Sequence, residues 1–412
     1  MKILWVKAGK LLPVDTGGKI RSYNILRHLA RQHEVNLLSY YGGRRDSDYE
    51  TAIAKQLPGA QTMSTAAPEG TVEQSLDYLF QLFSRAPYAV KKFTNPKVSA
   101  EVSRRLHDGT VDLAVCDFLS ASLNFPDQPS TPVVLFQHNV ETRLWQRMAS
   151  TERLPLRRLS YRIEARKMES YETRALQRFQ HVIAVSEYDR SEMLKLAPGC
   201  SITVVPTGVD TQQYQIAPSA SGRPPLIVFT GSMDWEPNVD AVEYFCSEIW
   251  PLVVAAFPDA RFQIVGRNPH SRVRRLAASS IEVTGTVPSV IDHLRSATVV
   301  VVPLRIGGGT RLKIFEAMAM AKAVVSTSIG AEGLDVTNGR DMLIADDAQS
   351  FADAILKLLR DPEMRRSYEN NAAALAVRYD WSQIARRFAD VLSAAASGHN
   401  NPRQSWSAAQ SV

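Results

Sequence analysis

The sequence has little cysteine and no long apolar run. Its three cysteines, Cys116, Cys200 and Cys246, form no Cys-x-x-Cys pair, which argues against a zinc site and fits a reducing compartment. No stretch reaches the roughly 18 consecutive apolar residues of a membrane-spanning helix. The N-terminal apolar run, 3–6, is shorter than the roughly 7–15 residues of a signal peptide. We therefore expect a soluble, cytoplasmic protein.

Familiar nucleotide-binding and nucleic-acid-binding signatures are also missing. The glycine run at 307–309 is not followed by the Gly-Lys-Ser/Thr of a kinase P-loop. No Gly-x-Gly-x-x-Gly follows the first predicted strand, which argues against a nicotinamide cofactor. The clustered basic residues alternate with glutamates and have no recognised nucleic-acid motif beside them, so we expect no nucleic-acid partner.

The composition is otherwise that of an ordinary globular protein, with 45% hydrophobic and 22% charged residues. At roughly 150 residues per domain, the length of 412 residues predicts two to three domains. The formal net charge is +6, and the segment Arg143–Arg178 holds ten Arg or Lys against four Glu, an excess of six. One basic segment thus carries the whole excess, which indicates an anionic partner.

Strands and helices alternate along the chain. The predicted strands are continuous Val/Ile-rich runs, typical of parallel strands buried on both faces. They are Lys2–Lys7, Val35–Tyr40, Val111–Val115, Pro132–Phe136, Val182–Val185 and Ile202–Val205, then Leu226–Thr230, Phe262–Val265, Ile281–Val283, Thr298–Pro303 and Ala323–Ser326.

This pattern predicts an α/β fold with two Rossmann-like, doubly wound domains facing a cleft. Residues 1–216 form the first domain, 217–225 a linker rich in Pro and Ser, and 226–380 the second domain. We expect a helix at 381–396 that packs back on the first domain, and a disordered tail at 397–412. Because ligands bind at the carboxyl ends of parallel strands, a cleft between two such domains suits a two-substrate reaction.

The most informative stretch is Val299–Ala321, where a buried strand leads through Gly307–Thr310 into a helix that starts near Arg311. Glycines let the backbone approach a ligand, and a helix N-terminus favours an anion. Arg311 and Lys313 place two cations in the first turn, where the helix dipole disfavours them without an anionic partner. We interpret this as a phosphate or diphosphate site; a solvated basic turn is the alternative.

Three further features are candidate site residues. Glu316 follows the phosphate loop among apolar neighbours, a position suited to accepting ribose hydroxyls, although a surface charge paired with Lys313 is equally compatible. Gly17 and Gly18 form a second glycine loop before a helix. His138 follows a buried strand and stands where it would contact a substrate hydroxyl, or it is a structural histidine.

These residues resemble a known family. The run Gly307–Glu316 with the following AMA and AVVST segments is similar to the donor signature of retaining glycosyltransferases of the GT-B fold, family 4 (group 1). Thr16–Lys19, His181–Ser186, Thr203–Asp210 and Phe229–Ser232 also match, in the right order, so the resemblance covers residues 1 to about 390.

The resemblance implies transfer of a sugar from a nucleotide-sugar donor, with retention at the anomeric carbon and no metal or other cofactor. His138 would contact the donor sugar as the catalytic residue, and Glu316 would bind the nucleotide ribose. The donor diphosphate would be bound by Gly17, Gly18, Gly309, Thr310, Arg311, Leu312 and Lys313.

The sequence departs from the family at three places, one of them Thr207, where the family commonly has asparagine. Gly308 stands where the family often has a first glutamate, eight residues before the second. Ser232 and the residues after it replace the frequent Arg and Lys that follow the Phe229–Gly231 strand, so diphosphate neutralisation depends on Lys313 or Arg267. The missing glutamate and cations leave open the alternative of a non-catalytic partner. A sugar-nucleotide epimerase on the same fold is a second alternative, although the candidate carboxylates and histidines for its chemistry are few.

On the acceptor side, we expect a glycan or lipid-linked acceptor in cell-envelope or exopolysaccharide synthesis. The apolar stretch Leu76–Phe83 and the basic segment Arg143–Arg178 suit peripheral contact with the anionic inner face of the plasma membrane. A solvated basic helix is the alternative. The nucleotide base, the sugar, the acceptor, the linkage and the oligomeric state are left open by the sequence.

Overall fold

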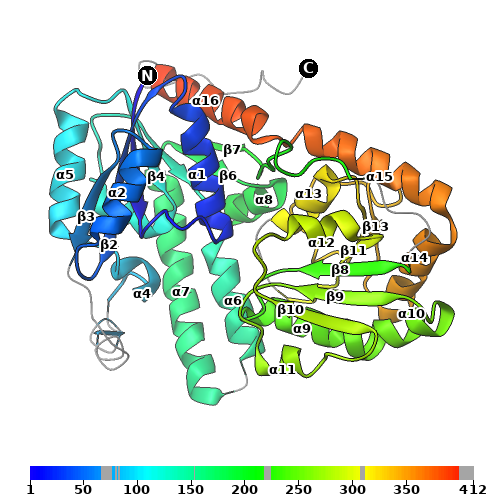
Figure 1. The fold of residues 1–412 in the computed structure, drawn as a ribbon. Helices are drawn as coiled ribbons and strands as arrows, with labels where there is room; N and C mark the ends of the chain where they lie inside the picture. The colour runs from blue at the N-terminus through cyan, green and yellow to red at the C-terminus, as the bar shows by residue number, and fades with distance from the viewer. Residues whose placement is uncertain are drawn as a thin grey trace. The chain divides into compact units, whose positions relative to one another are not determined.

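The computed structural model describes residues 1–65, 77–78, 81, 84–152, 154–217, 224–306 and 311–398. They form two compact units, each with its own parallel sheet (Figure 1). Unit 1 comprises residues 1–206 and the end of the chain from 384, and unit 2 comprises 207–383. Most of the stretch 76–83 and of the tail, and residues 218–223 of the linker, lie outside the described residues.

The described residues of unit 1 form a seven-stranded sheet in the order β3-β2-β1-β4-β5-β6-β7, with every pairing parallel. Its strands are β1 (Lys2–Ala8), β2 (Glu34–Gly42), β3 (Gln61–Thr65), β4 (Leu113–Asp117), β5 (Val133–Phe136), β6 (His181–Ala184) and β7 (Ile202–Val204). This is the Rossmann strand order with one strand added, and the order reverses between β1 and β4.

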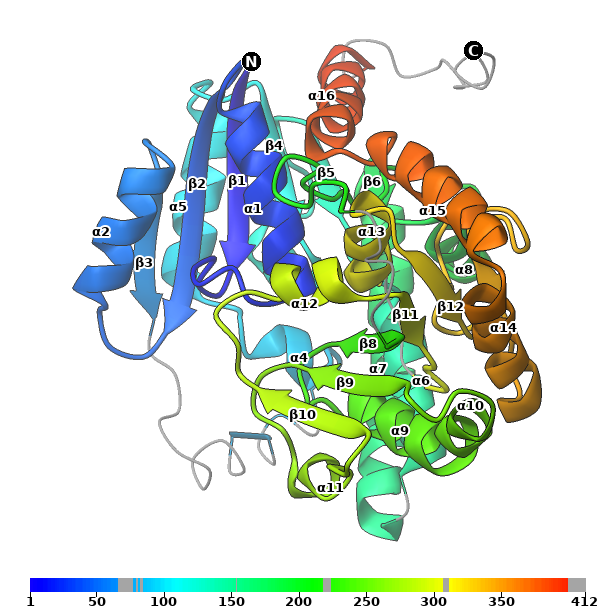
Figure 2. The same ribbon diagram turned by 45° about the vertical axis from the view of Figure 1, so that its right-hand side comes forward.

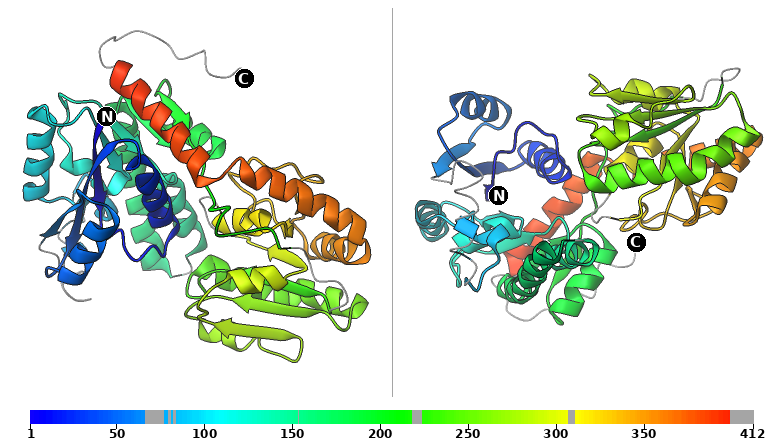
Figure 3. Two further views of the ribbon diagram at one scale, coloured as in Figure 1. Left: turned by 45° about the horizontal axis from the view of Figure 1, so that its top comes forward. Right: turned by 90° about the horizontal axis from the view of Figure 1, so that it is seen from below.

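Helices cover both faces of this sheet (Figure 3). Leu4 and Val6 of β1 pack on one face with α5 (Pro96–His107) and α7 (Pro155–Arg178). Trp5 points to the other face, where its ring lies 5.6 Å from that of Phe388 in α16 (Trp381–Gly398). The remaining helices of unit 1 are α1 (Gly17–Leu29), α2 (Ser47–Gln56), α4 (Tyr88–Lys91), the 3-10 helix η1 (Leu119–Asn124), α6 (Glu141–Thr151) and α8 (Glu187–Leu196).

Unit 2 repeats the design with six strands among the described residues, in the order β10-β9-β8-β11-β12-β13. The strands are β8 (Leu226–Thr230), β9 (Arg261–Val265), β10 (Ile281–Gly285), β11 (Val299–Val302), β12 (Ala323–Ser326) and β13 (Leu343–Ile344). The order reverses between β8 and β11, and all four valines of β11 are fully buried, as expected of a central parallel strand.

The helices of unit 2 follow the strands in alternation (Figure 2). They are α9 (Glu236–Tyr244), the π-helical turn η2 (Phe245–Ile249), α10 (Trp250–Ala256), α11 (Ser271–Arg274), α12 (Ile291–Ser296), α13 (Leu312–Ala319), α14 (Ala348–Arg360) and α15 (Pro362–Val377). The two Rossmann-like units of the predicted fold class are therefore present, and both sheets are parallel.

The compact units divide after Pro206, whereas composition placed the boundary at the 217–225 linker. Backbone hydrogen bonds explain the difference. Val209 N donates to Tyr379 O, and Trp381 N donates to Val209 O, so the chain joins unit 2 before the proline-rich stretch begins. At the other end, α16 begins in unit 2 and continues in unit 1 from Ile384.

Candidate functional site

A polar cluster in unit 1 lies at the carboxyl ends of β1, β4 and β5, where the strand order reverses. Asp117 is the last residue of β4, and its carboxylate accepts hydrogen bonds from Trp5 Nε1 at 2.9 Å and Lys7 Nζ at 3.0 Å. His138, two residues after β5, places Nε2 2.8 Å from the other carboxylate oxygen. The strand ends thus bring together Lys7, Asp117 and His138, which are far apart in the sequence.

Burial keeps the His138 ring neutral, and its hydrogen bond to Asp117 fixes which ring nitrogen carries the proton. Burial alone would raise the pKa of Asp117, but Lys7 and His138 hold it below its ordinary value. Burial lowers the pKa of His138 to about 4, although Asp117 opposes this, so the ring is neutral at pH 7. Because an ionised carboxylate only accepts hydrogen bonds, the ring proton is assigned to Nε2, and Nδ1 is an acceptor.

The Nδ1 atom of His138 faces helix α1. It lies 3.3 Å from Arg21 Nη1, which also donates to the His138 carbonyl at 3.3 Å. Burial lowers the pKa of Arg21 to about 10, which leaves the guanidinium charged at pH 7. A methyl group built on Gly18 would lie 3.4 Å from Nδ1, so the start of α1 at Gly17 and Gly18 packs beside the ring.

A second cluster lies in unit 2, where α13 follows β11. Gly309 and Thr310 lie outside the described residues. Arg311 is buried and precedes Leu312, the first residue of α13. From the next position, Lys313 Nζ donates to Asn238 Oδ1 at 3.0 Å and lies 4.0 Å from the centre of the Phe229 ring.

Gly231 makes room for this lysine at the end of β8, and Gly266 lets the end of β9 come close to Gly231. A methyl group on Gly231 would lie 2.8 Å from Lys313 Nζ and 2.7 Å from Asn238 Nδ2. A methyl group on Gly266 would lie 1.6 Å from the Gly231 carbonyl oxygen. Only glycine at position 266 therefore allows the two backbones to lie this close. Arg267, the next residue, donates from Nε to Ser232 Oγ at 3.0 Å. Arg267 and Lys313 therefore reach the residues that follow β8, where the sequence lacks the cations of its family.

The charge of Lys313 depends on what binds beside it. Burial, and to a smaller extent the nearby charge of Arg311, lowers the pKa of Lys313 to about 7, while Glu316 opposes both. Its hydrogen-bond acceptor, Asn238, is neutral. An anion beside Lys313 and Arg311 would stabilise both cations, so the arrangement suits a phosphate or diphosphate group.

Glu316 lies one turn further along α13. Its Oε1 accepts a hydrogen bond from the Tyr214 hydroxyl at 3.1 Å. Burial raises the pKa of Glu316, and Tyr214 and Lys313 oppose that shift. The remaining acceptor sites of this partly buried carboxyl suit a ligand with hydroxyl groups.

The structure therefore groups the predicted residues within each unit, Gly17, Gly18 and His138 in one and Arg311, Leu312, Lys313 and Glu316 in the other. Several of their partners were not predicted: Lys7, Arg21, Asp117, Tyr214 and Asn238. Asp117 ends a predicted strand region, which was a usable signal. Tyr214 is 102 residues from Glu316, and nothing in the sequence pattern joined them.

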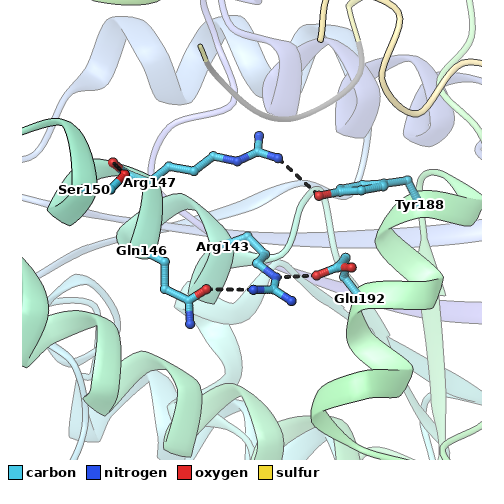
Figure 4. Close-up of a pocket in the computed structure, with 6 residues that line it drawn as sticks. All are labelled: Arg143, Gln146, Arg147, Ser150, Tyr188 and Glu192. Carbon is cyan, nitrogen blue, oxygen red and sulfur yellow. Dashed lines mark hydrogen bonds and ion pairs between the residues drawn. The ribbon is translucent and has the colours of Figure 1, made fainter. Parts of the chain in front are cut away.

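A separate polar pocket of about 370 Å³ lies between α6 and α8 (Figure 4). Arg143 forms an ion pair with Glu192 and donates to Gln146 at 2.9 Å, and Arg147 donates to the Tyr188 hydroxyl at 3.1 Å. Ser150 completes the lining. The two arginines of this pocket, both in the basic segment, thus bind other side chains of unit 1.

Two features are absent from the described residues. No group of three or more His, Cys, Asp or Glu side chains among them is arranged to hold a metal ion. None of the described helices combines the length and apolarity needed to cross a membrane.

Comparison with known families gives two matches that follow the two units. Residues 16–213 match the family described as Glycosyltransferase Family 4, and residues 224–361 match Glycosyl transferases group 1. A phosphatidyl-myo-inositol mannosyltransferase from Mycolicibacterium smegmatis is 30% identical over 219 residues, which are 51% of this chain and 56% of that relative. The similarity thus spans about half the length of the curated relative.

Solved structures resemble the chain over nearly its whole length. Sucrose-phosphate synthase from Thermosynechococcus elongatus has a TM-score of 0.71 and 16% identity, covering 95% of this chain and 98% of that one. Anabaena HepE in complex with UDP has a TM-score of 0.66 and 16% identity, covering 96% of this chain and all of that one. At 16% sequence identity, the similarity to these two structures shows that they share the fold of this chain.

Proposed function

Because the chain belongs to the group 1 and family 4 glycosyltransferases of the GT-B fold, we propose that it transfers a sugar from a nucleotide-diphosphate-sugar donor to a glycan or lipid-linked acceptor. The observation that carries this proposal is the cluster on α13. Lys313, a cation with a neutral partner, lies one turn before Glu316, whose carboxyl retains acceptor sites. In a nucleotide sugar, the negative charge of the diphosphate would face Lys313 and the hydroxyl groups of the adjacent ribose would face Glu316.

In this proposal the donor diphosphate contacts Lys313 and Arg311, together with the backbone at Gly309, Thr310 and Leu312. A cation at the leaving group stabilises the charge that develops there during transfer. Glu316 accepts the ribose hydroxyls, and Tyr214 holds one oxygen of its carboxyl in place. Arg267 adds a third cation near the end of β8.

The resemblance also assigns Gly17 and Gly18 to the donor diphosphate and His138 to the donor sugar. Because its proton is assigned to Nε2, His138 would accept a hydrogen bond from a sugar hydroxyl at Nδ1, in place of the one from Arg21. Asp117 would fix the ring orientation through Nε2, so we regard it as a positioning residue.

We propose that transfer retains the anomeric configuration. The acceptor hydroxyl oxygen forms a bond to the anomeric carbon on the face that the diphosphate leaves, and the bond from that carbon to the diphosphate oxygen breaks. The hydroxyl proton passes to the departing diphosphate, and Lys313 and Arg311 stabilise its charge. No metal or other cofactor takes part in this proposal.

The acceptor class rests on the relatives. The mannosyltransferase relative is named for a phosphatidyl-inositol acceptor, which favours a lipid-linked acceptor and a role in envelope or exopolysaccharide synthesis. Such a role would place the protein in the cytoplasm, at the inner face of the plasma membrane.

Isothermal titration with UDP, GDP and ADP tests the donor site. We expect one nucleotide to bind the wild type and to bind Glu316→Ala about 10- to 150-fold more weakly, because a hydrogen bond to a charged group contributes about 1.5–3 kcal/mol. Glu363→Ala, an exposed carboxylate in the first turn of α15, is the matched control. Equal affinity of Glu316→Ala and wild type would refute the ribose assignment.

The same titration bears on the two alternatives. Absence of binding by all three nucleotides would favour the non-catalytic partner. Binding without transfer, but with interconversion of a nucleotide sugar into its epimer, would favour the epimerase.

A further inference from the structure

Exposed leucines gather at one end of the paired helices α6 and α7. Leu154 is 55% exposed, Leu156 is 84% exposed and Leu159 is 55% exposed. Three of the six exposed large hydrophobic side chains among the described residues thus lie within residues 154–159. Exposed apolar side chains are ordinary when scattered, but a contiguous group indicates a binding surface.

Exposed arginines lie among these leucines. The side chains of Arg157, Arg158, Arg162 and Arg166 are exposed, and none of them forms a hydrogen bond or ion pair with another described residue. The stretch 154–163 contains no acidic residue. We call residues 154–162 the basic tip.

Four other cations of the basic segment have side-chain partners, unlike the arginines of the basic tip. Arg143 pairs with Glu192, and Arg147 donates to Tyr188. Lys167 pairs with Glu164. Arg178 pairs with Asp127, also on unit 1. The charge excess noted in the sequence is therefore divided between internal contacts and one exposed surface.

The basic tip sits at the end of a supported structure. Figures 1 and 2 show α6 and α7 side by side, with their connection at the end away from the sheet of unit 1. The rings of Trp145 and Tyr161 pack across the pair, with centroids 6.0 Å apart. The leucines are thus presented at the end of two packed helices.

We propose that the basic tip is a membrane-docking surface, in which Leu154, Leu156 and Leu159 enter the headgroup region of an anionic bilayer. The neighbouring arginines would bind lipid phosphates through bidentate hydrogen bonds. A second copy of the chain fits this surface poorly, because a two-fold contact brings identical positive patches together. The inference names the surface that would hold the protein at the membrane where the proposed function places it, although docking itself needs no nucleotide sugar.

Co-flotation of the full chain with vesicles tests this proposal. The probes are phosphatidylcholine vesicles with and without roughly one-third phosphatidylglycerol, at low and high salt. We expect wild type to float with the anionic vesicles at low salt, and Leu156→Glu/Leu159→Glu to lose at least about tenfold in bound fraction. Arg157→Glu/Arg158→Glu should lose binding to a similar extent.

Matched controls make the same chemical changes elsewhere. Val377→Glu alters another exposed apolar side chain, 62% exposed on α15, and Arg366→Glu alters an exposed arginine on the same helix. Both should float as wild type does. Equal flotation of tip and control variants, or no flotation of wild type at low salt, would overturn the proposal. So would tip variants that alter only the oligomeric mass, since the surface would then bind protein.

Binding of UDP, GDP and ADP by the same tip variants separates the two proposals. Lost flotation with unchanged nucleotide affinity supports docking alone, whereas failure of nucleotide binding in wild type leaves the flotation result standing.

Discussion

Lys313 Nζ donates a hydrogen bond to the Asn238 side-chain oxygen 3.0 Å away, at the end of the strand after which the family places cations of its own. The lysine comes from α13, 75 residues further along the chain. A cation supplied from α13 thus occupies the neighbourhood of β8. This relationship leads to the first two predictions.

Replacing Lys313 with Met should weaken binding of the nucleoside diphosphate about 10- to 150-fold, the effect of losing a charge-assisted hydrogen bond. Binding of the corresponding nucleoside, which has no phosphate, should change little. Isothermal titration with both ligands measures the difference, and Lys357→Met on the exposed side of α14 is the control. An equal loss for nucleoside and diphosphate would place Lys313 away from the phosphates.

Diphosphate affinity should fall as pH rises above about 7. Burial lowers the pKa of Lys313 to about 7 in the free protein, and a bound diphosphate raises that pKa, so binding takes up a proton. The dissociation constant should increase by up to about tenfold per pH unit between roughly pH 7 and 9. The same titration with Lys313→Met should show a flat profile, and a flat wild-type profile would contradict this prediction.

Tyr214→Phe should weaken nucleotide binding by about 2- to 12-fold. The change removes the hydrogen bond to Glu316 Oε1, which contributes about 0.5–1.5 kcal/mol to holding the carboxyl in place. Tyr368→Phe in α15 makes the same change where no described residue bonds to the hydroxyl. If both variants bind nucleotide as wild type does, Tyr214 has no positioning role.

Unit 1 should lose stability in mild acid through His138. Its pKa in the folded protein is about 4, against an ordinary 6.5, so the unfolded chain binds more protons between these values. Stability therefore falls as pH decreases through that window, by up to about 1.4 kcal/mol per pH unit from this residue. Hydrogen exchange of β1 and β4 amides in wild type and His138→Gln measures it. The variant should show a shallower dependence; an unchanged slope would assign the effect to other groups.

Gly266→Ala should destabilise unit 2 by about 1–3 kcal/mol, because the added methyl group would overlap the Gly231 carbonyl oxygen. Gly398→Ala is a control, since a methyl group there meets no atom within 4 Å. Thermal unfolding followed by circular dichroism measures the shift. A melting temperature equal to that of the control would show that the two backbones separate easily.

The central strands of both sheets could be predicted because burial on both faces selects continuous apolar runs. Leu226–Thr230 and Ala323–Ser326 agree with β8 and β12 to the residue. The sequence did not reveal β3 and β13, which lie at sheet edges. The residues of β3, QTMST, are mostly polar, and β13 has only two residues, so neither gives a periodic signal.

The local position of a candidate site residue was predictable where it lies just after a strand or at the start of a helix. His138, Arg311 and Lys313 have such positions, and the structure places His138 and Lys313 beside polar partners. Pairings between distant segments, such as Tyr214 with Glu316, depend on how the chain folds back. The strand pattern limits which strand ends meet, but it does not reveal which side chains meet there.

The course of α16 has a consequence for how the protein is made. Phe388 completes a ring cluster with Trp5 and Phe136, so the core of unit 1 draws on both ends of the described chain. Unit 2 is one uninterrupted stretch, residues 207–383, and its contacts are all available once Gln383 leaves the ribosome. During synthesis the second half of the protein can therefore finish folding before the first half does, and fragments that end before α16 lack part of the first core.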